Sequence, residues 1–187
     1  MSSGAPRGWP VRGALRHSTP GRADAPPHYD GLMAPIPSLV AEFLGRSRIA
    51  VAGVSRDAGQ PANAIFRRLR DSGHEVVPIN PQAREVERVP CYPDLASIPG
   101  TVEGVMIATH PDVSVEIARQ SAARGVDLVW FHRSFGGGSV SPAAVVACRT
   151  SGIRCIVGGC PLMYCEPVDV AHRCMRWWLR WRGRVPR

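Results

Sequence analysis

Apolar and polar residues follow one another in a regular pattern between residues 48 and 157. Five short runs are rich in β-branched residues and lie at 49–53, 75–79, 104–108, 127–131 and 153–157. Most of these runs are nearly continuous in apolar residues, which is typical of strands buried on both faces of a parallel sheet. The pattern therefore predicts five parallel strands.

The stretches between these runs have the features of helices. Three of them are each followed by a glycine, the residue at which helices commonly end, and they cover 62–72, 112–124 and 142–151. Further helices are predicted at 38–44 and at about 168–182, with a single helical turn at 94–98. Strands that alternate with helices predict an α/β fold, a three-layer, doubly wound parallel sheet in a single domain over residues 35–187.

Residues 1–34 differ from the rest of the chain. They are rich in proline, glycine, arginine and serine and have no hydrophobic periodicity, so we expect a disordered leader. They lack the apolar segment of a secretory signal, and no uncharged apolar run approaches the roughly 20 residues of a membrane helix. We therefore expect a cytoplasmic protein with no membrane partner.

The formal net charge is +8, and all 23 basic residues are arginine. Because lysine is absent, enzymes that form a Schiff base and nucleotide sites of the Walker type are excluded. Six arginines and no acidic residue fall in 173–187, where a solvated tail is favoured over a nucleic-acid contact. Trp177 and Trp181, one helical turn apart, are expected to pack in the core, and a homodimer contact is left open.

Ligands of open parallel sheets bind beyond the carboxyl ends of the strands, near the point where the strand order reverses. After the first predicted strand, Gly53 and Ser55 would let the backbone approach a phosphate at the start of the next helix, although a plain tight turn is the alternative. The dinucleotide fingerprint is not met, because Ser55 and Ala58 stand where it requires glycine. The second strand ends in Asn80 instead of an acidic residue, so NAD is disfavoured.

Several short segments occur together and in order between about residues 37 and 186. They are 51–55 with Asn63, 77–81, 91–93, 104–109 with Pro111, 129–132, 159–161 and 166–167. In this combination the chain resembles the small CoA-binding proteins, single Rossmann-like domains similar to the nucleotide-binding domain of the succinyl-CoA synthetase alpha subunit. Residues 1–34 lie outside the resemblance.

The resemblance implies that the chain binds coenzyme A, with no catalytic residue assigned. Its ADP half would lie over the first crossover loop, its adenosine near the end of the second strand, and its pyrophosphate or pantetheine near the loop after the third. The implied cofactor-binding residues are Gly53, Val54, Ser55, Arg56, Asn63, Asn80, Pro81, Thr109, His110, Pro111 and His132. Arg56 and Arg84 are candidate phosphate partners from their positions.

Two enzymatic alternatives remain open at this stage, an NAD(P)-linked oxidoreductase and an acyl transferase that depends on Cys160. A cysteine near His110 and His132 could supply an activated thiolate, but structural roles are favoured for all three residues. None of the six cysteines belongs to a Cys-x-x-Cys pair, so we expect no metal site.

Overall fold

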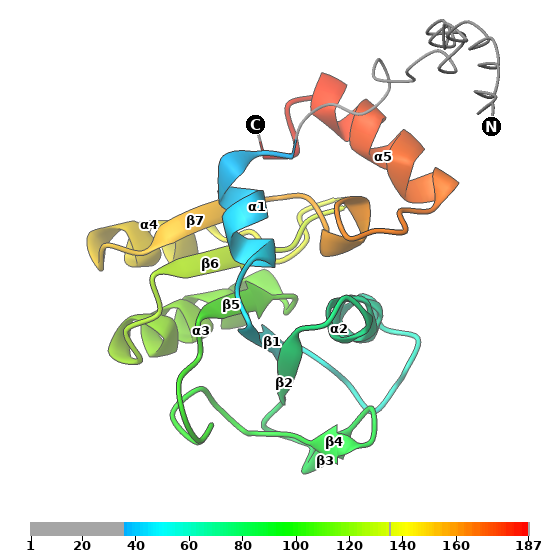
Figure 1. The fold of residues 1–187 in the computed structure, drawn as a ribbon. Coiled ribbons are helices and arrows are strands. Elements are labelled where there is room, and N and C mark those ends of the chain that lie inside the picture. Colours follow the sequence, from blue (N-terminus) through cyan, green and yellow to red (C-terminus); the bar gives the residue numbers. More distant parts are fainter. Residues whose placement is uncertain (1–35, 135, 187) are drawn as a thin grey trace, which may run out of the picture. The chain divides into compact units, whose positions relative to one another are not determined.

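The computed structural model describes residues 36–134 and 136–186, so the leader expected at 1–34 lies outside the described part of the chain. Five parallel strands form one sheet in the order β2-β1-β5-β6-β7 (Figure 1). Their bounds are β1 Arg48–Ala52, β2 Glu75–Ile79, β5 Gly104–Ile107, β6 Leu128–Phe131 and β7 Arg154–Val157. The predicted five-stranded parallel sheet is confirmed, and its order reverses between β1 and β5.

Five α-helices and one short 3-10 helix accompany this sheet in the described residues. They are α1 Ser38–Leu44, α2 Pro61–Asp71, α3 Pro111–Ala123, α4 Pro142–Thr150, η1 Pro161–Met163 and α5 Val170–Trp181. Proline opens α2, α3 and α4, a position where its missing N–H costs nothing and its fixed φ suits the helix. None of the helices in this part of the chain is long and apolar enough to cross a membrane.

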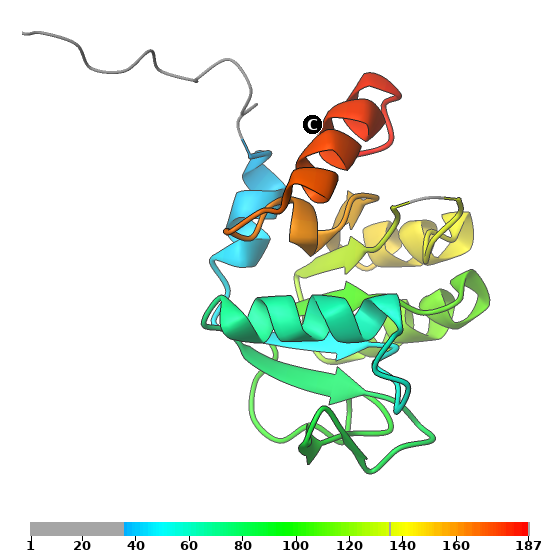
Figure 2. The same ribbon diagram turned by 90° about the vertical axis from the view of Figure 1, so that its right-hand side faces the viewer.

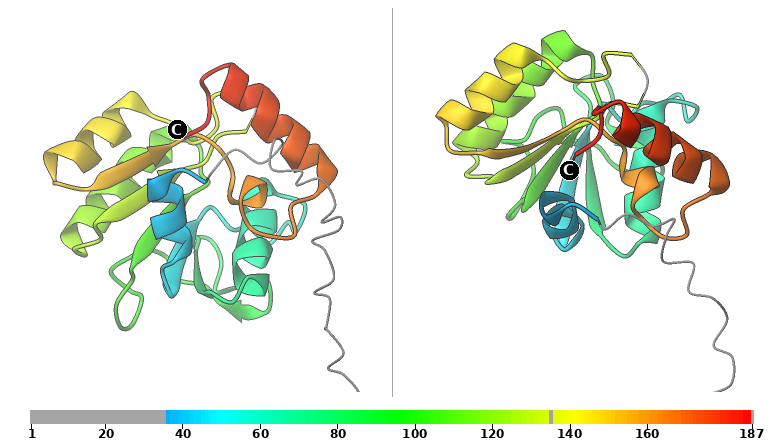
Figure 3. Two further views of the ribbon diagram at one scale, coloured as in Figure 1. Left: turned by 45° about the horizontal axis from the view of Figure 1, so that its top comes forward. Right: turned by 90° about the horizontal axis from the view of Figure 1, so that it is seen from above.

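The sheet separates two hydrophobic cores. Alternate residues of each strand face opposite cores, as Ile49 and Ala50 do in β1. The first core is closed by α1, α2, η1 and α5, and the second by α3 and α4. Figures 2 and 3 show the resulting three layers, with α3 and α4 together on one side of the sheet.

Two predicted details differ from the structure. The expected helical turn at 94–98 is reduced to one hydrogen-bonded turn, in which the Ile98 N–H donates to the Leu95 carbonyl at 3.4 Å and the Asp94 carboxylate accepts from the Ser97 N–H and hydroxyl at 2.8 and 2.7 Å. The expected core packing of Trp177 and Trp181 is wrong, since these side chains are 72% and 76% exposed. The structure further contains a small antiparallel hairpin that the pattern did not predict, β3 Glu85–Val86 and β4 Val89–Pro90.

Candidate functional site

The loops after β1 and β5 touch where the strand order reverses. Gly53 follows β1 with φ +102°, and a Cβ added to it would lie 2.5 Å from the carbonyl oxygen of Ala108 and 3.2 Å from Cγ2 of Thr109. Only glycine combines this conformation with such a close approach. Gly53 therefore brings the two loops together at the edge of the sheet where open α/β folds bind ligands.

The loop between β1 and α2 is held by Asn63, a buried side chain in the first turn of α2. Its Oδ1 accepts a hydrogen bond from the Ser55 N–H at 2.9 Å, and its Nδ2 donates to the Ser55 carbonyl at 2.7 Å. The hydroxyl of Ser55 accepts from the Asp57 N–H at 3.1 Å. Asn63 therefore fixes the conformation of this loop from beneath and is shielded from solvent.

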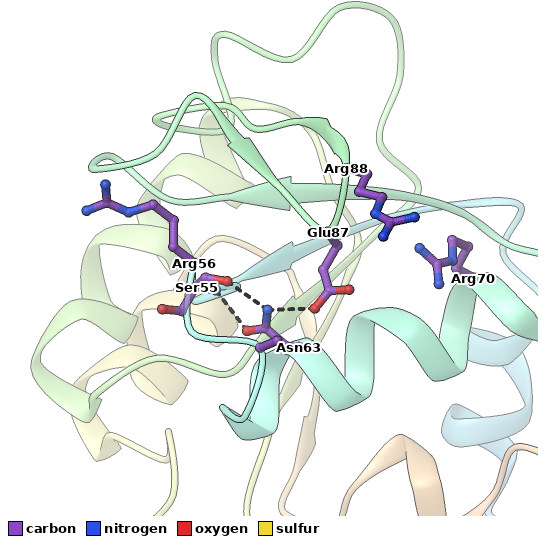
Figure 4. Close-up of a pocket in the computed structure, with 7 residues that line it drawn as sticks. Ser55, Arg56, Asn63, Arg70, Glu87 and Arg88 are labelled. Atoms are coloured by element: carbon purple, nitrogen blue, oxygen red, sulfur yellow. Dashed lines mark hydrogen bonds between the residues drawn. The ribbon is translucent and has the colours of Figure 1, made fainter.

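A pocket of about 400 Å³ opens between α2 and the β3–β4 hairpin, with a lining that extends from Asn63 in the first turn of the helix to Arg70 in its last (Figure 4). It is lined by Ser55, Arg56, Ala58, Asn63, Arg70, Glu87 and Arg88. Three arginines face one glutamate in this lining, so the pocket is electropositive. In Figure 4 the side chains of Arg70 and Arg88 approach one another, whereas Arg56 points away from them.

The single acid of the pocket is already engaged. The Glu87 carboxylate accepts from Asn63 Nδ2 at 2.8 Å and pairs with Arg67 Nη1 at 2.7 Å. Arg88 forms no ion pair with another described residue, whereas Arg70 pairs with the exposed Asp71 at 3.4 Å and its guanidinium carbon lies 5.7 Å from the centre of the Phe66 ring. The positive charge of Arg70 and Arg88 is therefore available to an anionic ligand.

Sequence reasoning missed Arg70, Glu87 and Arg88 as pocket residues. Glu87 and Arg88 form the turn of the hairpin with φ +50° and +65°, values that usually require asparagine or glycine in a two-residue turn. The chain has neither at this turn, so the usual signal of a hairpin was absent. The predicted phosphate partner Arg84 lies ahead of β3 and does not line the pocket, in contrast to Arg56.

Asn80 and Pro81 follow β2, next to the loop after β1. Asn80 Nδ2 donates to the Val54 carbonyl at 2.9 Å, and its Oδ1 accepts from the Gln82 N–H at 2.8 Å. The Asn80 side chain thus ties the two loops together, while Pro81 is exposed beside it. An asparagine suits this link between loops, and it offers no carboxylate to a ribose.

The loop after β5 leads into α3. The Thr109 hydroxyl donates to the His110 carbonyl at 3.2 Å and lies 3.3 Å from the Ser114 hydroxyl. His110 is the N-cap of α3, with an exposed side chain whose Nδ1 is 3.2 Å from the Asp112 carboxylate, and Pro111 opens the helix. The exposed N-terminus of α3 therefore borders the contact between the two loops that Gly53 makes.

His132 follows β6, where its N–H donates to the Ile107 carbonyl of β5 at 2.9 Å. Its Nε2 is 3.0 Å from the Ser134 hydroxyl, and burial lowers the pKa of the imidazole from 6.5 to about 4. The ring is therefore neutral near pH 7, so it can donate or accept a hydrogen bond but cannot attract an anion by charge. The loop that follows folds back on it, as the Ser139 N–H donates to the His132 carbonyl at 2.8 Å.

Cys160 follows β7 and is only 4% exposed. Burial raises the pKa of its thiol to about 12, so the nucleophilic thiolate is essentially absent at neutral pH. The structure therefore offers no support for acyl transfer to this sulfur. The described residues also contain no group of three or more histidine, cysteine or acidic side chains able to hold a metal ion.

The structure brings the predicted residues into two neighbouring groups. One group lies at or beside the arginine-lined pocket, and the other follows β5 and β6 along the same edge of the sheet. The contact of Gly53 with the Ala108–Thr109 backbone joins the two groups. The first contains Val54, Ser55, Arg56, Asn63, Asn80 and Pro81, and the second contains Thr109, His110, Pro111 and His132.

The fold defines a Rossmann-like α/β protein, in which the loops after β1 and β5 meet at the switch point of the sheet. The sequence profile described as the CoA binding domain matches residues 47–166, which include both groups of site residues. The chain belongs to the CoA-binding domain family.

Curated relatives include both large ligases and small proteins. The chain is 32% identical over 93 residues to acetate–CoA ligase [ADP-forming] II of Archaeoglobus fulgidus. The matched region covers 49% of this chain and 14% of the ligase. It is 24% identical over 139 residues to the uncharacterized protein YneT of Bacillus subtilis, covering 74% of this chain and 95% of that protein. The chain thus spans only a small part of the ligase and nearly all of the small relative.

Solved structures show the same contrast. A hypothetical protein from Pyrococcus horikoshii OT3 superposes with a TM-score of 0.61 at 23% identity, over 79% of this chain and 99% of that one, which bears on the fold alone. The apo dinucleotide-forming acetyl-coenzyme A synthetase 1 of Ca. Korarchaeum cryptofilum gives 0.52 at 26% identity, over 60% of this chain and 26% of the synthetase. The family fold therefore occurs alone and as one part of longer enzymes.

Proposed function

We propose that this protein binds coenzyme A, or an acyl-CoA, along the carboxyl edge of its sheet and catalyses no reaction on it. The observation that carries the proposal is the pocket beside α2, in which Arg88 forms no ion pair with another described residue and Arg70 meets only the exposed Asp71 carboxylate, at 3.4 Å. Coenzyme A bears a 3′-phosphate and a pyrophosphate, and arginine and helix N-termini are the groups that bind such anions.

In this proposal the 3′-phosphate occupies the pocket, where Arg56, Arg70 and Arg88 supply charge. Gly53, Val54 and Ser55 form the floor beneath the ADP moiety. Asn63 acts through the loop it fixes, because its own side chain is buried and hydrogen-bonded.

Adenosine would lie near Asn80 and Pro81, beside the loop that Asn80 ties to Val54. The pyrophosphate or pantetheine would pass Thr109, His110 and Pro111 at the start of α3. The neutral His132 would contribute a hydrogen bond rather than a charge. The whole ligand would then follow the row of loops from β2 to β6.

Two enzymatic alternatives receive less support from the geometry. An NAD-linked reaction lacks an acidic residue at the end of β2, where Asn80 stands. An acyl transferase that depends on Cys160 lacks an accessible thiolate. The proposal includes a cytoplasmic location, consistent with six cysteines that are all free thiols.

Calorimetric titration of the purified chain with four nucleotides tests the proposal. We expect CoA to bind, dephospho-CoA to bind about tenfold more weakly because it lacks the 3′-phosphate, and NAD and ATP to bind more weakly still. Equal affinity for CoA and dephospho-CoA would show that the arginine pocket does not bind the 3′-phosphate. A preference for NAD over CoA would overturn the proposal as a whole.

The variant C160A separates a binding protein from a thiol enzyme. Since the Cys160 sulfur is buried and protonated, we expect the affinity of C160A for CoA to stay within about twofold of the native value. Native protein incubated with acetyl-CoA should also gain no acetyl group by intact-mass analysis. Acetylation that disappears in C160A would establish the transferase instead.

A further inference from the structure

Helix α5 turns an apolar ridge away from the rest of the domain. Val170, Cys174, Trp177 and Trp181 are all exposed and recur at i, i+4, i+7 and i+11, so they form one stripe along the helix. Leu179, on the opposite side of α5, is fully buried in the first core. We call these four residues the tryptophan stripe. The figures show α5 at the periphery of the domain (Figures 1 and 2).

Helix α5 has a buried inner face as well as the exposed tryptophan stripe. Arg176 is buried on the inner side, where its guanidinium lies 5.1 Å from the centre of the Tyr164 ring and its Nη1 donates to the Met163 carbonyl at 3.3 Å. The inner face of α5 therefore holds Arg176 together with Leu179, Met175 and Trp178, which pack on the first core. Trp177 and Trp181 lie outside it, although a surface helix usually keeps its large apolar residues on the buried face.

Arginines flank the stripe. Arg173 and Arg180 are exposed beside it on the same side of the helix, and neither forms a salt bridge with another described residue. The sequence from 173 to 187 contains six arginines and no acidic residue. Any partner of this surface must therefore offer both an apolar layer and negative charge.

A second copy of the chain does not fit these requirements. Two stripes in contact would bring the arginines of both copies together. A helix of 12 residues is about 18 Å long, and its two tryptophans, 72% and 76% exposed, make up most of a ridge of roughly 400 Å². This is about half of the roughly 800 Å² that each partner of a stable protein interface buries. The surface is a narrow convex ridge, which a rigid partner could cover only with a matching groove.

We propose that the tryptophan stripe docks on the surface of an anionic phospholipid bilayer. A bilayer needs no preformed groove, its interface accepts tryptophan rings between headgroups and acyl chains, and its phosphates attract the flanking arginines. Helix α5 would lie in the plane of the interface with Leu179 still facing the core. The expectation of no membrane partner came from the missing spanning segment, and this proposal departs from it because a helix can bind the bilayer surface without spanning it.

Co-sedimentation of the full chain with vesicles tests this proposal. Vesicles of phosphatidylcholine containing phosphatidylglycerol should bind the protein, vesicles of phosphatidylcholine alone should bind it much more weakly, and added salt should reduce binding. W177S/W181S should lower the partition coefficient at least about tenfold. R173Q/R180Q should lower it by about fivefold for each arginine removed.

The matched control is V113S/V146S, which removes two exposed apolar side chains from α3 and α4. Its partition coefficient should stay within about twofold of the native value, since these residues lie outside the stripe. Circular dichroism and CoA titration of each variant separate lost docking from lost folding. The proposal does not depend on the CoA site, so a chain that fails to bind CoA can still bind vesicles.

Three results would overturn it. The native chain could fail to bind phosphatidylglycerol vesicles at low salt, or W177S/W181S could bind them as well as the native chain does. The third is a tryptophan-dependent self-association, or a tryptophan-dependent binding to nucleic acid, without any binding to vesicles.

Discussion

The two ends of the parallel sheet use arginine in opposite ways. At the amino end, Arg154 binds the Glu42 carboxylate with both of its terminal nitrogens, at 2.6 and 2.7 Å, and Asp127 at 2.5 Å. Arg46 joins the same two acids. In the pocket that begins beside the loop after β1, at the carboxyl end, and extends along α2 to Arg70, the arginines Arg56, Arg70 and Arg88 share the lining with one glutamate, which is itself paired with Arg67.

The difference shows which end is built to hold a ligand. At the amino end every one of these charges is neutralised within the domain, and the hydrogen bond from Arg154 lowers the pKa of Glu42 below its ordinary 4.5. At the carboxyl end the polar backbone is satisfied internally by Asn63 and Asn80, while the arginines are left with surplus positive charge. The chain therefore stabilises its loops with amides and keeps its guanidinium groups for an anion.

The largest effect is expected from G53A. The new methyl group would lie 2.5 Å from the Ala108 carbonyl oxygen in a backbone conformation of φ +102°, so we expect a loss of about 3 kcal/mol or more in the free energy of unfolding. CoA binding should be lost as well, because the two loops can no longer touch. Urea denaturation and calorimetric titration measure the two effects.

G125A is the control for G53A. Gly125 also has a positive φ, +71°, but nothing lies within 4 Å of an added Cβ. It should therefore cost only about 1 kcal/mol of stability and leave CoA affinity unchanged. If the two variants lose the same stability, the close contact between the loops does not contribute to the fold.

The sequence was sufficient for the sheet because the determinants of each strand are local. The β-branched runs end within a residue or two of the observed strands. Gly53 was expected at the site from its position after β1, and Asn80 from the resemblance to CoA-binding proteins; both roles stay predictions. Strand order was not needed for this, since parallel strands place all their carboxyl ends at one edge.

The parts that escaped prediction depend on tertiary contacts. Arg70 and Arg88 meet only because an unpredicted hairpin folds over α2, with Glu87 and Arg88 in a turn that carries no glycine signal. The orientation of α5 could not be predicted from its apolar pattern, because Arg176 is buried against Tyr164 while Trp177 and Trp181, which were expected in the core, are exposed. The contact that buries Arg176 is made with Tyr164, which lies outside α5, so the sequence of the helix alone does not reveal it.

The second prediction uses pH to separate the two ends of the sheet. His132, at the carboxyl end, has a pKa lowered by burial to about 4 in the folded state, against 6.5 ordinarily. Between these values the unfolded chain binds a proton that the folded chain does not, so stability falls as the pH decreases from 6.5 towards 4, by at most about 3 kcal/mol. Glu42, at the amino end, has a lowered pKa, so its contribution is present above 4.5 and is lost only at lower pH.

Urea denaturation of native protein and H132Q between pH 7 and about pH 4.5 tests this assignment. The native protein should lose stability across this range, and H132Q should lose clearly less because its side chain does not titrate. E42Q is the matched variant at the amino end and should retain the native slope in the same range. A slope in H132Q equal to the native slope would show that another group, not His132, controls acid stability.

The smallest effect sharpens the contrast between the arginines themselves. R70Q/R88Q should weaken CoA binding about tenfold, leave dephospho-CoA binding nearly unchanged and alter the unfolding free energy by less than about 0.5 kcal/mol, since both side chains are exposed. R46Q/R154Q removes the same charge from the amino end and should do the reverse, lowering the melting temperature while CoA affinity stays native. If both double variants weaken CoA binding equally, the affinity reflects the overall positive charge of the protein, and the arginine pocket has no special role in holding the 3′-phosphate.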